Sequence, residues 1–202
     1  LPIDPAHIGR GYQDVVRINS QSGKGGVAYI LQRDFGFHLP RWTQIDFSRV
    51  IQQEAERRQT ELTSDDVINV FENTYLNQSA LALQDYEIKN TGGAVSFKGS
   101  VRLGDEVVDV VGNGNGPLSA FINGIADKLQ KNIHVINYAE HALTQNDITS
   151  TDANAVAYLQ LNIDGEIYSG IGTCSSTVSA MLKAALSALA QAQLVDSVHS
   201  PA

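Results

Sequence analysis

Residues 106–122, EVVDVVGNGNGPLSAFI, are followed sixty positions later by residues 166–182, EIYSGIGTCSSTVSAML. Apolar residues recur at matching steps of the two segments, which indicates an internal repeat. In each segment an alternating stretch leads through small turn residues to apolar residues at helical spacing. We therefore predict a strand followed by a helix, twice in the chain.

Each copy extends upstream into two further strands, which alternate apolar and polar residues between Gly, Asn and Asp turns. Two βββα units with their helices on one face of a sheet form an α+β sandwich with internal pseudo-twofold symmetry. The predicted strands are 81–89, 94–103 and 106–111 in the first copy and 134–143, 153–163 and 166–173 in the second; the predicted helices are 117–129 and 177–194.

The two copies are expected to differ in one hairpin. Residues 94–97 (AVSF) resemble residues 155–158 (AVAY) at an offset of sixty-one. A one-residue slip in the following hairpin would restore the offset of sixty.

The second predicted helix is rich in alanine. Its weakly polar surface is smooth enough to pack closely against another copy of the chain, and such a sheet also has exposed edges. Both features favour a homodimer. The alanines concerned are Ala184, Ala185, Ala188 and Ala190.

The residues before the repeat have a different pattern. Two extended segments are predicted around the glycine-rich turn at 20–26, the second of them at 27–31. Apolar spacing then predicts a helix around Ile45 and Val50, and Thr63 offers an N-cap for another helix. The chain therefore divides into a small mixed α/β connecting subdomain, residues 1–77, and a repeat domain, residues 78–202.

Composition limits the possible partners. The net charge of −8 and the pI near 5.0 argue against binding to nucleic acid or anionic membranes, which clustered Lys and Arg would favour. Arg57 and Arg58 stand beside Glu54 and are expected on a solvated helix face. No run of eighteen apolar residues suggests a membrane span, so we expect a cytoplasmic protein. The start at Leu1 without methionine suggests a fragment of a longer protein.

Three motifs that suggest chemistry are better explained otherwise. Residues 22–26 (SGKGG) resemble the start of a phosphate-binding loop, but 27–31 predict a strand where that loop needs a helix. His134 and His141 are seven residues apart, which would put them on opposite faces of a strand, and no metal site is expected. Cys174, the only cysteine, has no local base to activate it and is predicted to be a packing residue.

The glycine-rich loop at 112–117 (GNGNGP) is the strongest candidate for a ligand site. Glycine allows close approach of the backbone, and the amides at the following helix start attract a carboxylate. Leu118, Ser119 and Phe121 could form a small apolar wall beside them. A free aliphatic amino acid would suit this combination, although a plain strand-to-helix turn would have the same sequence.

Residues 19–30 (NSQSGKGGVAYI), 112–118 (GNGNGPL) and 138–143 (YAEHAL) together resemble consecutive signatures of the 2-isopropylmalate synthases. The resemblance spans almost the whole chain. It implies a connecting subdomain followed by a leucine-binding regulatory domain of paired βββα units. The catalytic barrel of that family, which condenses acetyl-CoA with 2-oxoisovalerate and holds a divalent metal, would precede these residues. No cofactor is therefore expected in this chain.

The resemblance also implies a site. In the family, leucine lies between the two units near the dimer interface, and a homodimer is expected. Position 173 carries Thr where the family pattern suggests an aliphatic residue. The matching residues are Gly114, Gly116, Ser119, Val135, Tyr138, Ala142, Ala153 and Thr173.

Three alternatives stay open. The chain could be a related sensor, which binds isoleucine in a citramalate synthase or lysine in a homocitrate-type relative. It could also be a dimerisation module without a ligand, in which Gly114 and Gly116 only turn the chain. The third possibility, an autonomous enzyme, requires turnover of acetyl-CoA and 2-oxoisovalerate by this chain.

Overall fold

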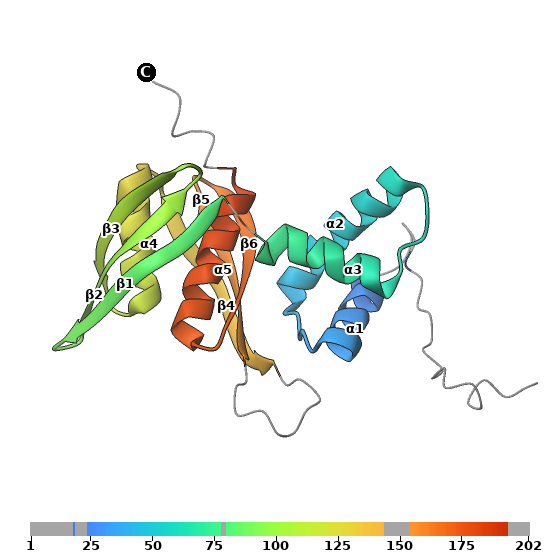
Figure 1. The fold of residues 1–202 in the computed structure, drawn as a ribbon, viewed down its shortest axis with the longest axis horizontal. Coiled ribbons are helices and arrows are strands. Elements are labelled where there is room, and N and C mark those ends of the chain that lie inside the picture. The colour runs from blue at the N-terminus through green and yellow to red at the C-terminus, as the bar shows by residue number, and fades with distance from the viewer. Residues whose placement is uncertain (1–17, 19–23, 78–79, 144–153, 194–202) are drawn as a thin grey trace, which may run out of the picture.

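The computed structural model describes residue 18 and residues 24–77, 80–143 and 154–193. The elements are α1 (Lys24–Phe35), α2 (Arg41–Arg58), α3 (Ser64–Phe71), the π-helical turn η2 (Glu72–Leu76), β1 (Leu81–Thr91), β2 (Ala94–Leu103), β3 (Glu106–Gly114), α4 (Pro117–Leu129), β4 (Ile133–Leu143), β5 (Asn154–Ile163), β6 (Glu166–Cys174) and α5 (Thr177–Gln191). Figure 1 shows a helical part, formed by residues 24–76, beside a larger part, formed by residues 81–191, that contains the six strands and two helices, α4 and α5.

The predicted repeat is confirmed as two βββα units. Each unit has its own antiparallel sheet, with strand order β1-β2-β3 in the first sheet and β4-β5-β6 in the second, and each sheet is followed by one helix. The predicted strands and helices differ from the observed ones only at their ends. The fold is therefore the predicted α+β class.

The predicted slip between the two units is wrong. Phe97 pairs with Gly112 in the first sheet, and Ala157 pairs with Gly172 in the second, exactly sixty residues on. An offset of sixty-one would align Phe97, which lies in the core beneath the helices, with Tyr158, whose side chain lies on the other face of its strand. The similarity of residues 94–97 to residues 155–158 is therefore coincidental. The alternation of buried and outward-facing side chains along the strands supports the offset of sixty.

Each helix lies very close to the last strand of its own sheet, because glycines leave room for it. A Cβ atom added at Gly112 would lie 2.1 Å from the carbonyl oxygen of Ala120, and one added at Gly172 would lie 2.2 Å from that of Ala180. Any side chain at either position would push the helix off the sheet. The two helices and the sheet faces beneath them share one hydrophobic core.

The alanines of α5 lie in this core. Ala184, Ala185 and Ala188 have no exposed surface, and Ala190 is partly buried against the same cluster. Their predicted role as a contact between chains is therefore wrong. Small side chains here let α5 approach its own sheet and the first sheet, which it also contacts through β1.

The predicted strand at 27–31 is also wrong, because these residues belong to α1. Val27, Ile30 and Leu31 are buried at the helical spacing of three and four residues. A short apolar run of this kind fits either period, and the neighbouring helices select the helical one. The other predicted extended segment precedes the turn at 20–26. Of the residues before this turn the structure describes only Ile18, which forms an isolated bridge with Leu62.

The two predicted helices of this part are confirmed as α2 and α3. Thr63 caps α3: its hydroxyl accepts from the amide of Asp66, whose carboxylate accepts from the amide of Thr63. The helical part packs on the second sheet, on the face opposite α5, and buries Val156, Tyr158 and Ile171 in a second core. The corresponding face of the first sheet has no such cover among the described residues.

Candidate functional site

The glycine loop joins β3 to α4 and leaves the start of that helix open. Gly116 is the N-cap of α4 and has no side chain to accept from the first-turn amides. The hydroxyl of Ser119 instead accepts from the amide of Gly116 at 3.0 Å and donates to the Asn115 side chain at 2.7 Å. A Cβ at Gly114 would lie 2.3 Å from the Ser119 hydroxyl oxygen. Gly114, Gly116 and Ser119 therefore form one compact group at the positive end of the helix.

The next three predicted residues lie on one face of β4. Val135, Tyr138 and Ala142 pair with Leu161, Leu159 and Ala155, which belong to the core beneath the helices. Although they lie on this core side, the side chains of Val135 and Tyr138 are each 40% exposed. Helix α5 does not cover this strand, so its apolar face is accessible.

Strand β4 brings this face to the glycine loop. It contacts α4 and runs back along it after a tight turn. Tyr138 is five residues beyond Ile133, about 17 Å along a strand, and α4 extends about 20 Å from its end back to its start. From these lengths we infer that Tyr138 is level with the first turn of α4, which agrees with the bond of its counterpart Tyr86 to Ser179 in the first turn of α5. We call this place, formed by Gly114, Gly116, Ser119 and the β4 face, the α4–β4 junction.

One acidic residue shares this face of β4. Glu140 pairs with Ala157, so its side chain lies on the same side as that of Tyr138. The Tyr138 hydroxyl donates to the Glu140 carboxylate at 2.5 Å. Partial burial, and then this bond to Glu140, raise the pKa of the Tyr138 phenol. Glu140 stands in the YAEHAL motif, two residues beyond Tyr138, so strand alternation alone would have predicted that the two side chains share a face.

The last two predicted residues do not join this group in the structure. Ala153 lies outside the described residues. Thr173 is on β6, at the opposite edge of the second sheet, and pairs with Val156 on the face covered by the helical part. It lines a different pocket, so the single chain does not bring Thr173 to the α4–β4 junction.

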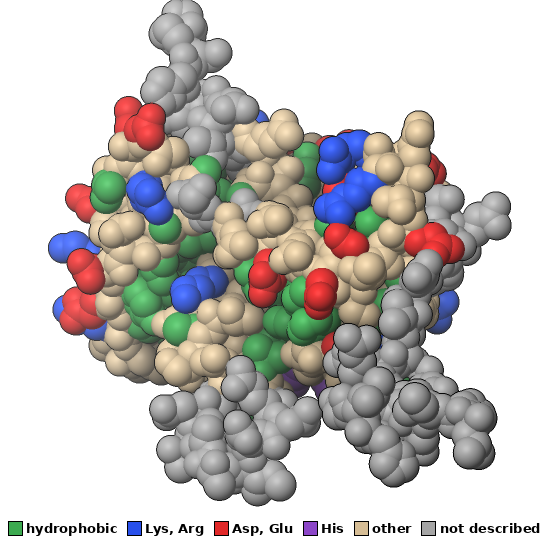
Figure 2. Space-filling model, turned by 45° about the vertical axis from the view of Figure 1, so that its right-hand side comes forward, with side chains coloured by type: hydrophobic (Ala, Val, Ile, Leu, Met, Phe, Trp, Pro, Cys, Tyr) green, Lys and Arg blue, Asp and Glu red, His purple; other side chains and the backbone are tan. Residues whose placement is uncertain are grey.

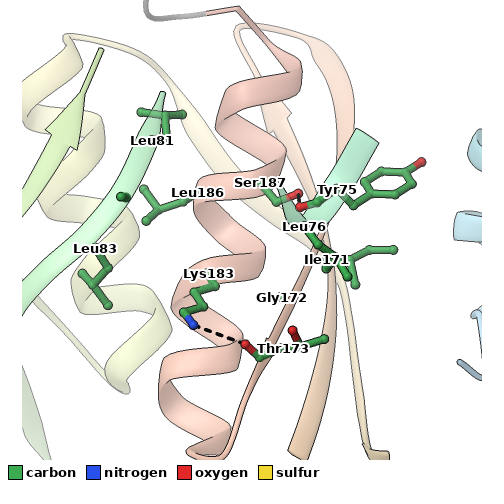
Figure 3. A pocket seen from close by; sticks show the side chains of 11 residues that line it. Tyr75, Leu76, Leu81, Leu83, Ile171, Gly172, Thr173, Lys183, Leu186 and Ser187 are labelled. Carbon is green, nitrogen blue, oxygen red and sulfur yellow. Dashed lines mark hydrogen bonds between the residues drawn. The ribbon is translucent and has the colours of Figure 1, made fainter. Parts of the chain in front are cut away.

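The pocket that contains Thr173 has a volume of about 210 Å³ and lies where β1, β6, α5 and η2 meet. Figure 3 shows leucines of β1 and α5 on one side and Tyr75, Leu76 and Ile171 on the other, with the Lys183 ammonium donating to the Thr173 carbonyl. Its lining residues are Tyr75, Leu76, Leu81, Ala82, Leu83, Ile171, Gly172, Thr173, Lys183, Leu186 and Ser187.

The helical part meets both repeats at this pocket, and hydrogen bonds near it link the helical part to the second repeat. The Ser187 hydroxyl of α5 donates to the Tyr75 carbonyl at 2.8 Å, and the Gln191 amide donates to the Thr74 carbonyl. The Ser169 hydroxyl of β6 donates to the Asp46 carboxylate of α2. A movement of α5 or β6 would therefore reach α2 and η2 directly.

The histidines need one correction. A β-bulge between Val135 and Asn137 shifts the alternation of β4 by one residue. His134 and His141 consequently lie on the same face, not on opposite faces. The ring of His141 contacts the Tyr158 hydroxyl at 3.0 Å and accepts from the amide of His38 at 3.2 Å. Among the described residues, no group of three or more His, Cys, Asp or Glu side chains could hold a metal ion.

The loop at 22–26 also needs a correction. Helix α1 begins at Lys24 and includes residues 27–31. The predicted strand at 27–31 therefore cannot be used as a reason against a phosphate-binding loop. The sequence still argues against such a loop, because Ala28 and Tyr29 stand where its Gly-Lys pair would follow.

The two arginines singled out from the sequence are paired with acids. Arg57 and Arg58 both bind Glu54, and Arg58 also binds Asp66. Figure 2 shows Lys and Arg side chains scattered among Asp and Glu on the face it presents. The solvated helix face predicted from sequence is confirmed. No helix in the described part of the chain is long and apolar enough to cross a bilayer.

Comparison with known proteins identifies related sequences. Residues 61–193 match the family model described as LeuA allosteric (dimerisation) domain, and residues 1–32 match the model described as alpha-isopropylmalate synthase, post-catalytic domain-like. The chain is 42% identical over 194 residues to the 2-isopropylmalate synthase of Thermobifida fusca, covering 96% of this chain and 33% of that protein.

Two further 2-isopropylmalate synthases show the same coverage. That of Mycobacterium leprae is 39% identical over 196 residues, covering 95% of this chain and 32% of that protein. That of Alcanivorax borkumensis is 38% identical over 197 residues, covering 96% and 34%. The chain thus spans about a third of the length of the curated relatives it matches.

Proposed function

Because the chain belongs to the LeuA allosteric (dimerisation) domain family, we propose that it is the regulatory part of a 2-isopropylmalate synthase and binds L-leucine as a feedback signal. The open start of α4 beside an accessible apolar strand face carries this proposal. The parent protein would condense acetyl-CoA with 2-oxoisovalerate in a barrel outside this chain. The divalent metal of that reaction would belong to the barrel, because the described residues here offer no cluster of ligands for it.

The α4–β4 junction has the chemistry that an aliphatic amino acid needs. The first-turn amides of α4 have no side-chain cap at Gly116 and would accept a carboxylate. The exposed apolar face of β4 around Tyr138 would take the isobutyl group; Val135 and Ala142 lie about 20 Å apart along this face, so a single side chain would contact at most one of them. Full burial of a leucine side chain is worth roughly 2 kcal/mol, and one methylene changes affinity by roughly 10–200-fold. Such a site can rank leucine above valine.

Inhibition requires that leucine bind one arrangement of the parts more tightly than another. The bonds from Ser187 to Tyr75 and from Ser169 to Asp46 link the repeats to the helical part. We propose that they carry the signal toward the barrel through the connecting subdomain.

A second copy of the chain is the proposed partner. The face of the first sheet that points away from its helix exposes Val107 and Val111, at 61% and 59%. On the equivalent face of the second sheet the helical part buries Ile171, the counterpart of Val111, whereas the two valines of the first sheet have no cover among the described residues. Val111→Lys is expected to weaken a dimer that uses this face, and light scattering during size-exclusion chromatography would measure it.

Calorimetric titration of the chain with leucine, isoleucine, valine and lysine tests the sensor function. Leucine should bind most tightly. Preferred binding of isoleucine or lysine would instead indicate the citramalate or homocitrate relative, and no binding of any of them would leave a dimerisation module. Turnover of acetyl-CoA and 2-oxoisovalerate by this chain alone would contradict the regulatory assignment.

Gly116→Ala gives a variant test of the site. An added Cβ at Gly116 would meet no atom within 4 Å, so the fold should be kept while the methyl group enters the proposed carboxylate position. Leucine affinity should fall at least about tenfold, equivalent to roughly 1.4 kcal/mol. Gly25→Ala in α1, where an added Cβ also meets nothing, is the matched control. A variant that assembles poorly but still binds leucine normally would favour a purely structural loop.

A further inference from the structure

The Glu140 carboxylate is an exception on an otherwise apolar strand face. Its neighbours on this face of β4 are Val135, Tyr138 and Ala142. Among the described residues, its side chain has one hydrogen-bond partner, the Tyr138 hydroxyl. A charge placed beside exposed apolar groups, with a single neutral donor, is chemically suited to a cationic ligand group.

The pseudo-symmetry shows what this strand face looks like without the acid. Through the pairing registers, Tyr86 of β1 is the counterpart of Tyr138, and Ile88 is the counterpart of Glu140. Ile88 packs against the core. The acid therefore belongs to the second copy alone, and the repeat itself does not require it.

The counterpart tyrosine makes a different bond. The Tyr86 hydroxyl lies 2.7 Å from the hydroxyl of Ser179, in the first turn of α5. Ser179 is sixty residues beyond Ser119, so the same bond in the other half would join Tyr138 to Ser119. Tyr138 instead turns along its own strand to Glu140. The two halves thus show a tyrosine bonded to the helix and a tyrosine bonded to an acid.

We propose that Glu140 binds the ammonium group of the effector, and that Tyr138 moves from Glu140 to Ser119 when the effector binds. This rests on the proposed function, because it concerns the same α4–β4 junction. The α4 amides would hold the carboxylate of the ligand, and Glu140 would hold the ammonium on the other side of the α-carbon. The ligand class is therefore an α-amino acid with a free ammonium group, and the corresponding carboxylic acid without nitrogen is discriminated against.

Titrations with two ligands test the role of Glu140. Leucine is compared with 4-methylpentanoate, which has the same carboxylate and isobutyl group but no ammonium. A charge-assisted hydrogen bond contributes enough for a change of about tenfold or more in affinity. The wild-type chain should prefer leucine by at least that factor. Glu140→Gln should lower leucine affinity to the level of 4-methylpentanoate, whereas Glu106→Gln, an exposed acid on β3, should change neither.

The outcomes separate this inference from the function on which it rests. If the wild-type chain does not bind leucine at all, the sensor function itself fails. If the wild type binds leucine and Glu140→Gln binds it equally well, the sensor function stands and the role of Glu140 is wrong. A thermal melt of Glu140→Gln without ligand checks that the variant is folded.

A double-mutant cycle tests the movement of Tyr138. Ser119→Ala should weaken leucine binding in the wild-type background by more than it does in a Tyr138→Phe background, because phenylalanine has no hydroxyl to bond the serine. Equal losses in both backgrounds would contradict the transfer to Ser119. The counterpart pair, Tyr86→Phe and Ser179→Ala, should show coupling in thermal stability without any ligand and none in leucine affinity.

Discussion

The two repeats have the same elements and the same pairing register, but they differ in what covers them. Strands β5 and β6 of the second sheet are covered on both faces, by α5 and by the helical part, while the first sheet is covered on one face only (Figure 1). Equivalent positions therefore have opposite environments: Ile171 is 1% exposed, and Val111, sixty residues before it, is 59% exposed. The repeated sequence pattern gives both copies the same local fold. The helical part, which packs on the second sheet only, makes the two copies different.

The same asymmetry applies to the junctions between the repeats. Tyr86 closes the α5 side by its bond to Ser179, while Tyr138 leaves the start of α4 accessible. Under the proposed function, the duplicated fold uses one copy of the junction for stability and the other for binding.

The largest expected effect concerns the feature that both repeats share. Gly112→Val and Gly172→Val each place a side chain at a position where even an added Cβ atom would lie within 2.5 Å of the helix backbone. Each should lower the free energy of unfolding by about 3 kcal/mol or more, measured by urea denaturation. Similar losses of unfolding free energy would confirm that α4 and α5 pack equally closely on their strands. A loss well below about 3 kcal/mol at either position would show that its helix can move away from the sheet.

The next effect should distinguish the two sheets. Ile171→Ala removes buried side-chain atoms and should cost about 3 kcal/mol. Val111→Ala, at the equivalent exposed position, should change stability by no more than about 0.5 kcal/mol. Both are measured by thermal or urea unfolding of the monomeric chain at low concentration. A large loss at Val111 would mean that another surface covers the first sheet.

A smaller difference is expected between the two tyrosines. Tyr86→Phe removes a partly buried hydrogen bond and should cost about 1 kcal/mol. Tyr138→Phe in the ligand-free chain should cost less, because its bond to Glu140 is exposed. Equal losses in thermal unfolding would remove the contrast between a structural and a binding junction.

The smallest expected effect is a loss of stability of the helical part at acidic pH. Hydrogen bonds from Arg57 and Arg58 lower the pKa of Glu54 from 4.5 to about 2. Since the folded state holds this proton more weakly than the unfolded state, the stabilisation is complete above about pH 4.5 and is lost as the pH falls toward about 2. Surface pairs of this kind contribute at most about 1 kcal/mol.

Acid should therefore affect the helical part before the repeats. Hydrogen bonds from Arg33 and from the Thr63 backbone, respectively, also lower the pKa of Asp34 and Asp66 in the helical part. Among the described residues of the repeats, only the carboxyl of Asp164, bonded to Lys131, behaves alike. The fluorescence of Trp42, the only tryptophan, reports on α2. A pH titration in which the far-ultraviolet β signal changes before this fluorescence would contradict the expected order.

The two elements that form the candidate site were indicated by the sequence. The glycine loop before a proline-started helix indicated an open helix end, and the family signatures added the β4 residues. Thr173 could not be separated from them in this way, because its position across the sheet depends on strand order. The contrast between Glu140 and Ile88 requires the pairing registers, including the bulges, which the sequence did not reveal.

By itself the sequence determined the βββα repeat and the cap of α3, because alternation, turn residues and capping act between near neighbours along the chain. Only the tertiary structure decided that residues 27–31 are helical, that the alanines of α5 face their own sheet, and that the second sheet is covered twice. These depend on which apolar surfaces meet. An apolar stripe records that a surface will be buried, but its partner is chosen by packing between segments far apart in the chain.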